Sequence, residues 1–142
     1  MSRADSPTFS QVIPSQLAEV ETLCGQIRAL LQKKDLCPVC FAVELLMRES
    51  LNNAILHGNE SDPAKLVTLR LWVGREWIRL QVCDQGTGFN WHKARPRGLD
   101  LTSTSGRGLH LYTLYADRVR FNRRGNQITL WISKKEQAGK EN

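Results

Sequence analysis

The sequence lacks any apolar run of the roughly 18 residues that a membrane-spanning helix needs. Residues 1–7 contain no apolar stretch of the kind found in signal peptides. Internal repeats and low-complexity tracts are absent as well. These absences exclude a transmembrane protein and a repeat array, and we expect a cytoplasmic protein that does not contact membranes.

Cysteine is scarce, because the chain has only four, too few for the disulfide scaffold of a small secreted domain. Cys37 and Cys40 have the spacing of redox and zinc motifs, at a point where a helix is predicted to begin. Neither a second cysteine pair nor a histidine cluster, which a zinc site would need, accompanies them. We interpret the cysteines as reduced structural residues and keep a redox or metal function as the alternative.

The length of 142 residues fits one ordinary domain. Hydrophobic residues make up 41% of the chain, which is enough for a packed core and excludes wholesale disorder. Lys and Arg outnumber Asp and Glu by 20 to 14, which gives a formal net charge of +6. We predict a single domain over residues 1–142, with its core over about 8–133 and a polar tail over 134–142.

Hydrophobic periodicity predicts helices and strands in alternating groups. Apolar residues at helical spacing predict helices over residues 16–34, 35–58 and 106–117. Apolar and polar alternation predicts strands over residues 8–13, 67–73, 78–82, 118–123 and 127–133. We expect Ser15 and Asp35 to be the N-caps of the first two helices, and Gly58 to end the second. The element order predicts an α+β fold, a two-layer sandwich with about three helices on one face of a mixed or antiparallel sheet of four to five strands.

Two polar lines run along the predicted second helix. Their members, four residues apart, are Glu44, Arg48 and Asn52 in the first line and Glu49, Asn53 and His57 in the second. The first line contains a Glu-to-Arg pair at the favourable i,i+4 spacing and is typical of a solvated face. The second shares its side of the helix with apolar residues, where polar groups are costly to bury without partners. It is either an internal hydrogen-bond network or a site.

Asp84 continues the inward face of the predicted strand over residues 78–82. Gly86 and Gly88 follow it and permit a tight turn and a close approach of backbone to a ligand. The carboxylate either accepts a hydrogen bond from a ligand, such as the amino group of a base, or caps its own turn.

Residues 89–105 show no periodicity, which predicts either an active-site lid or a disordered insertion. They lead into a second glycine turn, residues 105–109, at the start of a predicted helix, where free backbone amides attract phosphate. Four arginines follow, which would suit an acidic partner or nucleic acid: Arg118, Arg120, Arg123 and Arg124. We interpret them as a solvated strand face, so nucleic acid is not the partner that we expect.

The common nucleotide motifs are missing: the chain contains no GxGxxG, no GxxxxGK[ST] and no HRD loop. Three other motifs stand in order, Glu49-x3-Asn53-x3-His57-Gly58, Asp84-x-Gly86-x-Gly88-Phe89 and Gly106-Arg107-Gly108-Leu109. Together they resemble the N, G1 and G2 boxes of the GHKL (Bergerat-fold) ATPase superfamily, over residues 15–133. That superfamily includes gyrase, sensor histidine kinases, mismatch-repair ATPases and the heat-shock chaperone ATPase. Residues 106–117, GRGLHLYTLYAD, are similar to the anti-sigma factor serine kinases of bacterial partner-switching systems.

The resemblance implies roles for the N and G1 boxes. Asn53 would ligate Mg²⁺ and Glu49 would be the general base. Asp84 would accept a hydrogen bond from the adenine amino group, beside Gly86 and Gly88. Asn126 stands where the family usually has a threonine that helps to bind adenine, so the assignment of that position is weaker.

The resemblance also implies how the phosphates are held. The backbone amides of the second glycine turn would bind them, in residues Gly106, Arg107, Gly108 and Leu109. Three residues would close over the γ-phosphate of ATP: Thr104, Ser105 and Arg107.

The function that this resemblance implies is an ATP- and Mg²⁺-dependent protein serine kinase. It would phosphorylate a STAS-domain anti-sigma factor antagonist, sequester a sigma factor or another output protein, and form a homodimer. The alternatives are a non-catalytic ATP-dependent binding module, a nucleic-acid-binding domain that uses the arginines, and a detached histidine-kinase catalytic domain. The sequence shows no phospho-acceptor helix pair, which argues against the last of these.

Overall fold

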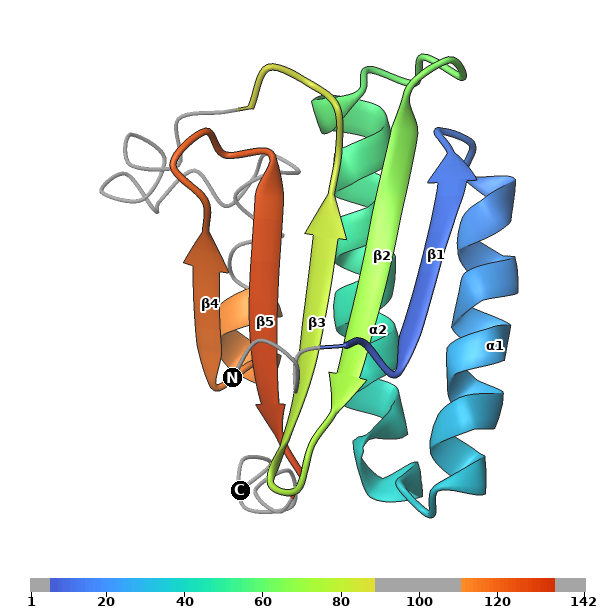
Figure 1. The fold of residues 1–142 in the computed structure, drawn as a ribbon, viewed down its shortest axis with the longest axis vertical. Coiled ribbons are helices and arrows are strands. Elements are labelled where there is room, and N and C mark those ends of the chain that lie inside the picture. Colours follow the sequence, from blue (N-terminus) through green and yellow to red (C-terminus); the bar gives the residue numbers. More distant parts are fainter. Residues whose placement is uncertain (1–5, 89–110, 135–142) are drawn as a thin grey trace.

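A five-stranded antiparallel sheet with helices on one of its faces forms the frame of the protein (Figure 1). The computed structural model describes residues 6–88 and 111–134. The elements are β1 (Phe9–Pro14), α1 (Ala18–Lys33), α2 (Cys37–Asn53), the π-helical turn η2 (Ala54–Gly58), β2 (Leu66–Val73), β3 (Trp77–Cys83), β4 (Arg118–Phe121) and β5 (Gln127–Ser133). Residues 111–115 of the predicted third helix are helical, and its beginning lies outside the described residues. This arrangement confirms the predicted α+β fold.

The strand order is β1-β2-β3-β5-β4, and each neighbouring pair is antiparallel. The last strand in the chain, β5, therefore lies between β3 and β4. Residue 83 at the end of β3 pairs with residue 127 at the start of β5. The segments that follow β3 and precede β5 therefore meet at one end of the sheet.

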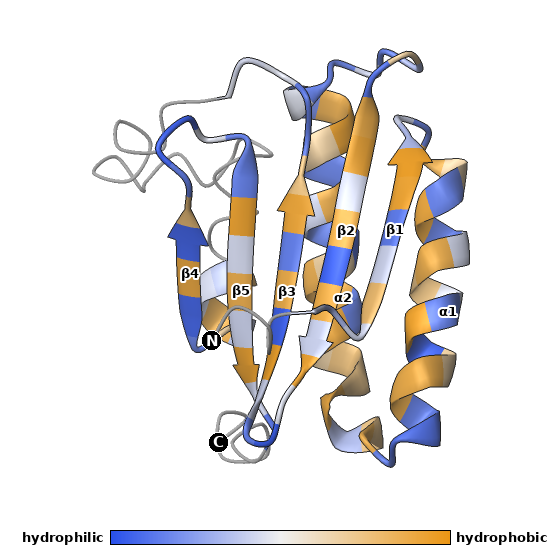
Figure 2. Cartoon of the chain, in the orientation of Figure 1, coloured by the Kyte–Doolittle hydropathy of each residue, from blue (hydrophilic) through white to orange (hydrophobic). Residues whose placement is uncertain are grey.

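The core lies between the sheet and the helices. Apolar side chains alternate with polar ones along β2 and β3, as Figure 2 shows. The largest fully buried side chains from the two layers are Leu23, Ile27, Leu31, Leu46, Met47, Leu51, Ile55, Leu69, Leu71, Ile78, Leu80 and Leu130. Because β-strand side chains point alternately to the two faces, the polar residues of the same strands form the open face of the sheet.

Neither predicted N-cap caps a helix. Ser15 is buried and its hydroxyl donates to the backbone oxygen of Lys65 at 2.7 Å, so Ser15 links β1 to the start of β2. Asp35 has a φ of 58° and ends α1, because its N–H donates to Gln32 and the next N–H donates to Leu31. This is a Schellman motif, for which a left-handed residue is required, and Asp tolerates that conformation better than most residues.

The predicted Glu44–Arg48 pair within one helix does not form. Arg48 instead donates to both carboxylate oxygens of Glu21 on α1, at 2.9 and 3.0 Å, and lowers the pKa of that carboxyl. Arg28 of α1 binds Glu44 in the same way. Side chains of two packed helices reach each other as easily as neighbours on one helix, and sequence spacing cannot distinguish the two cases. These pairs are exposed, so they contribute little to stability.

Asn59, directly after η2, is 0% exposed and joins three segments of the chain. Its Nδ2 donates to Ser15 Oγ at 2.8 Å and to the Leu66 oxygen at 3.1 Å, and its Oδ1 accepts the Gln85 N–H at 2.8 Å. It therefore holds the segment after β3 against the ends of β1 and β2.

We expect Asn59→Ala to lower the free energy of unfolding by about 2–4 kcal/mol, because it leaves several buried polar groups without partners. Urea unfolding followed by circular dichroism measures this. Asn52→Ala, which removes an amide outside this network, is the matched control and should change stability by less than about 0.5 kcal/mol. Equal stability of the two variants would contradict the role of Asn59.

None of the helices in residues 6–88 and 111–134 is long and apolar enough to span a membrane.

Candidate functional site

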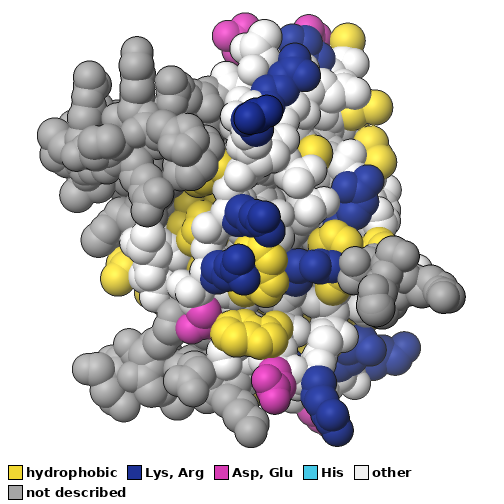
Figure 3. Space-filling model, turned by 60° about the vertical axis from the view of Figure 1, so that its left-hand side comes forward, with side chains coloured by type: hydrophobic (Ala, Val, Ile, Leu, Met, Phe, Trp, Pro, Cys, Tyr) yellow, Lys and Arg dark blue, Asp and Glu magenta, His cyan; other side chains and the backbone are white. Residues whose placement is uncertain are grey.

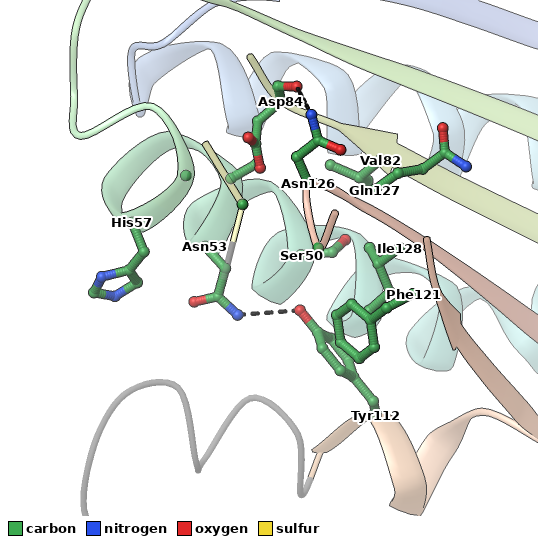
Figure 4. Close-up of a pocket in the computed structure, with 14 residues that line it drawn as sticks. Ser50, Asn53, His57, Val82, Asp84, Tyr112, Phe121, Asn126, Gln127 and Ile128 are labelled. Carbon is green, nitrogen blue, oxygen red and sulfur yellow. Dashed lines mark hydrogen bonds between the residues drawn. The ribbon is translucent and has the colours of Figure 1, made fainter. Parts of the chain in front are cut away.

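A cavity of about 130 Å³ opens between the end of α2 and the ends of β3 and β5 (Figure 4). Its lining residues are Ser50, Asn53, Ala54, His57, Gly58, Val82, Asp84, Gly88, Tyr112, Phe121, Gly125, Asn126, Gln127 and Ile128. Apolar side chains such as Val82 and Ile128 form one wall, and a few polar groups converge on the remaining space. This combination is typical of a site for a flat ligand with a polar edge.

Asp84 follows β3 immediately and lines the cavity. Its Oδ1 accepts the N–H of Gly86 at 2.8 Å, so it caps its own turn. Within the described part of the chain, its Oδ2 has no hydrogen-bond donor. Burial raises the pKa of the Asp84 carboxyl, and the bond from Gly86 opposes this only in part. The two predicted roles are therefore compatible, since one oxygen serves the turn and the other is available to a donor in the cavity.

Two glycines make the turn after Asp84 possible. Gly86 is buried, and a Cβ atom there would overlap the backbone carbonyl of Gly58 at the end of η2. Gly88 has a φ of 91°, which residues with a side chain rarely adopt, and a Cβ atom there would overlap the carbonyl of Arg124. The backbone of η2, the turn after β3 and the turn between β4 and β5 thus approach more closely here than side chains would allow.

Asn126 lies beside Asp84, as its predicted role requires. The Asp84 N–H donates to the backbone oxygen of Asn126 at 2.9 Å. The side-chain Nδ2 of Asn126 donates to the backbone oxygen of Asp84 at 3.3 Å (Figure 4). Asn122 donates from its own side chain to Asn126 Oδ1 at 2.8 Å. These amides fix the β4–β5 turn against the end of β3. A contact between Asn126 and a ligand stays a prediction.

Asn53 presents a buried oxygen that nothing in the described residues satisfies. Its Nδ2 donates to the hydroxyl of Tyr112 at 3.1 Å, whereas its Oδ1 is fully buried and has no hydrogen-bond partner there. A buried polar group left in this state costs about 1–3 kcal/mol. An amide oxygen is a suitable ligand for Mg²⁺, so this atom fits the metal that the sequence motif implies.

The three residues of the predicted line, Glu49, Asn53 and His57, do not all reach the cavity. Asn53 and His57 line it, and His57 is exposed. Glu49 is half-buried one turn before Asn53 but is not among the lining residues. Between Asn53 and His57 the helix changes to η2, where the Asn59 N–H donates to the Ala54 oxygen and the i→i+5 bond widens the turn.

The predicted phosphate-binding and lid residues lie outside the described residues. They are Thr104, Ser105, Gly106, Arg107, Gly108 and Leu109, together with the aperiodic segment over residues 89–105. Their roles stay predictions.

Several lining residues were not predicted from the sequence. Tyr112 is 3% exposed and contacts Asn53 across 59 positions of the chain. Phe121 and Ile128 are cross-strand partners in β4 and β5. Alternation alone could have placed Val82, Phe121 and Ile128 on the inward faces of their predicted strands, but it could not have brought them to one cavity.

The arginines after residue 117 belong to the open face of the sheet and its edge. Arg118 stacks over the ring of Trp131 at 4.8 Å, and Arg79 of β3 stacks over Trp72 at 4.0 Å. Figure 3 shows Lys and Arg side chains beside hydrophobic ones on this side of the molecule. Of the four predicted arginines, Arg118 thus has an aromatic partner within the sheet, which supports the interpretation of a solvated strand face for β4. Arg123 and Arg124 lie instead in the exposed turn between β4 and β5, because β4 ends at Phe121.

We expect this face to bind DNA weakly and to release it at moderate salt, since exposed arginines alone supply a non-specific electrostatic attraction. Fluorescence anisotropy of a labelled oligonucleotide at two salt concentrations measures the effect. Arg118→Gln with Arg120→Gln should weaken binding no more than Lys33→Gln with Lys34→Gln, which removes equal charge from the end of α1. Tight, sequence-selective binding that only the first pair abolishes would favour the nucleic-acid alternative.

Cys37 is exposed, Cys40 is half-buried, and both are free thiols. Among residues 6–88 and 111–134, no group of three or more His, Cys, Asp or Glu side chains is arranged to hold a metal ion.

Comparison with known proteins agrees with this geometry. The family model of the histidine kinase-like ATPase domain matches residues 13–134. Among solved structures, the fold is similar to the histidine kinase domain of a blue-light activated histidine kinase from Erythrobacter litoralis. The TM-score is 0.58 and the identity 19%, over 99% of this chain and 70% of that one. No curated protein has a significantly similar sequence.

The structural likeness, at 19% identity, supports the fold alone, but the family match extends over most of the chain. It includes α2, the turn after β3 and both strands that flank the cavity. The chain therefore belongs to the family of histidine kinase-like ATPase domains of the GHKL superfamily, a family of ATP-binding domains.

Proposed function

We propose that this protein is an ATP- and Mg²⁺-dependent serine kinase of the anti-sigma factor type. It phosphorylates a STAS-domain antagonist, and it sequesters a sigma factor or another output protein as a homodimer. The observation that carries the proposal is the arrangement on α2. There, the unsatisfied amide oxygen of Asn53 lies one helical turn from the carboxylate of Glu49.

Asp84 recognises the base of the nucleotide in this proposal. Its free oxygen accepts a hydrogen bond from the adenine amino group, while Val82 and Ile128 contact the ring plane. The adenine amino group is a donor, and a buried acceptor rejects bases that present an acceptor at that position. Asp84 therefore confers selectivity for adenine as well as affinity.

Asn53 would hold the magnesium ion through Oδ1, and the ion would neutralise charge on the phosphates during transfer. The Asn53 side chain is buried and hydrogen-bonded on its other side, so it offers this oxygen in one fixed orientation. Glu49 accepts the proton of the attacking serine hydroxyl. Its position on the same helix as Asn53 keeps the base and the metal ligand at a constant spacing.

The assignment to serine, and to a STAS-domain protein, is supported by residues 106–117, whose sequence is similar to anti-sigma factor kinases. The basic charge of the chain suits an acidic partner surface.

A second candidate function is an ATP-dependent binding switch without catalysis. The observation that favours it is the absence of Glu49 from the cavity lining. In that case, ATP would only select the conformation to which partner proteins bind.

Incubation of the purified protein with radiolabelled ATP and a STAS-domain protein from the same genome tests the proposal. We expect label on the STAS protein in an acid-stable form, as a phosphoserine gives. An acid-labile product would show a histidine kinase instead. ATP binding without any transfer would leave the binding switch as the function.

A further inference from the structure

Tyr112 connects the helical segment of residues 111–115 to Asn53, the proposed magnesium ligand. It lies within helical residues 111–115, three positions after Leu109, and its ring is buried against the end of α2. Its neighbour Tyr115 contacts Phe41 edge to face, with ring centroids 5.8 Å apart. The same helical segment therefore touches α2 through two tyrosines, and only the first is hydrogen-bonded to a cavity residue in the described part of the chain.

The bond between Tyr112 and Asn53 has a direction. A carboxamide has a donor end and an acceptor end, and here Asn53 Nδ2 donates to the Tyr112 oxygen at 3.1 Å (Figure 4). With its nitrogen fixed, the amide must present Oδ1 on the opposite side, where that atom is buried and has no partner among the described residues. A phenol can donate as well as accept, and the arrangement in this structure is the one that leaves Oδ1 free; Tyr112 is also the hydrogen-bond partner that holds the carboxamide among the described residues.

We propose that Tyr112 is a positioning residue that orients the Asn53 carboxamide so that Oδ1 can ligate the magnesium ion of a bound nucleotide. This inference rests on the proposed function. Partners of metal ligands commonly have such a role, and their loss typically lowers metal affinity 10- to 100-fold.

The test measures binding of a non-hydrolysable ATP analogue by calorimetry, once with MgCl₂ and once with EDTA. In Tyr112→Phe, we expect the Mg²⁺-dependent gain in affinity to fall about tenfold or more, with the affinity in EDTA unchanged. Tyr115→Phe removes the same atom from a neighbouring ring and should behave like the wild type. In an Asn53→Ala background, Tyr112→Phe should have no further effect, because it acts through Asn53.

A second measurement is made on the wild-type protein and needs a variant only to assign the signals. The chain has two tyrosines, so labelling with 3-fluorotyrosine gives two fluorine resonances, and Tyr115→Phe assigns them. We expect the Tyr112 resonance to shift when MgCl₂ is added to the nucleotide complex, and the Tyr115 resonance to stay in place.

The outcomes separate this inference from the proposed function. A wild-type protein whose nucleotide affinity does not depend on Mg²⁺ would overturn both. A wild-type dependence that Tyr112→Phe retains, or an equal loss of affinity with MgCl₂ and EDTA, would overturn the role of Tyr112 alone. A Tyr112 resonance that ignores Mg²⁺ would do the same.

Discussion

Asp84→Asn is expected to lower the affinity for ATP roughly 10- to 100-fold and to leave the fold intact. The loss corresponds to a hydrogen bond to a charged acceptor, about 1.5–3 kcal/mol. An asparagine also presents an N–H₂ group, which cannot accept from the adenine amino group. The fold should survive, because the Asn oxygen can still accept the Gly86 N–H that Asp84 Oδ1 accepts now.

Calorimetry with ATP, beside circular dichroism and thermal unfolding, measures this effect. Asp62→Asn is the matched control, because Asp62 Oδ1 accepts the Ala64 N–H in the same local pattern but lies outside the cavity. It should bind ATP as the wild type does. Wild-type affinity in Asp84→Asn, with an unchanged fold, would rule out adenine recognition by Asp84.

The pH dependence of binding gives a second measure of the same contact. Burial raises the pKa of the Asp84 carboxyl in the free protein above its ordinary value of 3.8. The ionised carboxylate is the better acceptor, so affinity is complete above the raised pKa and is lost as the pH falls through it. ATP binding should therefore weaken at a higher pH than titration of an exposed carboxyl would cause, and Asp84→Asn should abolish this dependence.

Glu49→Gln is expected to slow phosphate transfer about 10²- to 10⁴-fold while Mg·ATP still binds. The amide has nearly the shape of the carboxylate but cannot accept the proton of the attacking hydroxyl. Asn53→Ala should lose both activities, because a lost metal ligand weakens nucleotide binding as well as transfer. A transfer assay with the cognate STAS protein, run beside a nucleotide titration, separates the two effects.

Glu44→Gln is the control on the same helix. Glu44 binds Arg28 on the far side of α2, so its loss should leave the transfer rate at the wild-type level. If Glu49→Gln transfers phosphate at the normal rate, Glu49 is not the base. If the wild type binds ATP and never transfers it, the non-catalytic switch is the function.

Local pattern was sufficient to predict most of the elements. Each strand pairs its apolar positions on one face, so alternation in residues such as Leu69 and Leu71 predicts both the strand and its buried side. The same alternation places Asp84 on the inward face before any fold is known. The prediction for Asp35 was wrong because two local patterns compete there. An Asp at that position can cap the start of the next helix or end the preceding one, and in the structure Asp35 ends α1.

Contacts between distant segments could not be predicted from spacing. Arg48 binds Glu21, 27 positions away, instead of Glu44, because α1 and α2 pack side by side. The helix also widens at η2, directly after Asn53, where the Asn59 N–H donates to the Ala54 oxygen. Periodicity assumes a regular helix and therefore misses such a change.

The sequence by itself determined the local structure of this protein: helices and strands from their periods, an inward carboxylate at Asp84, and glycines where backbone segments approach closely. The order of its motifs also identified the superfamily. Only the tertiary structure decided that β5 lies between β3 and β4, which brings Asn126 to Asp84, and that Tyr112 packs on Asn53. The physical reason is that these contacts join residues 42 and 59 positions apart. They depend on how whole elements pack, and no local period encodes that.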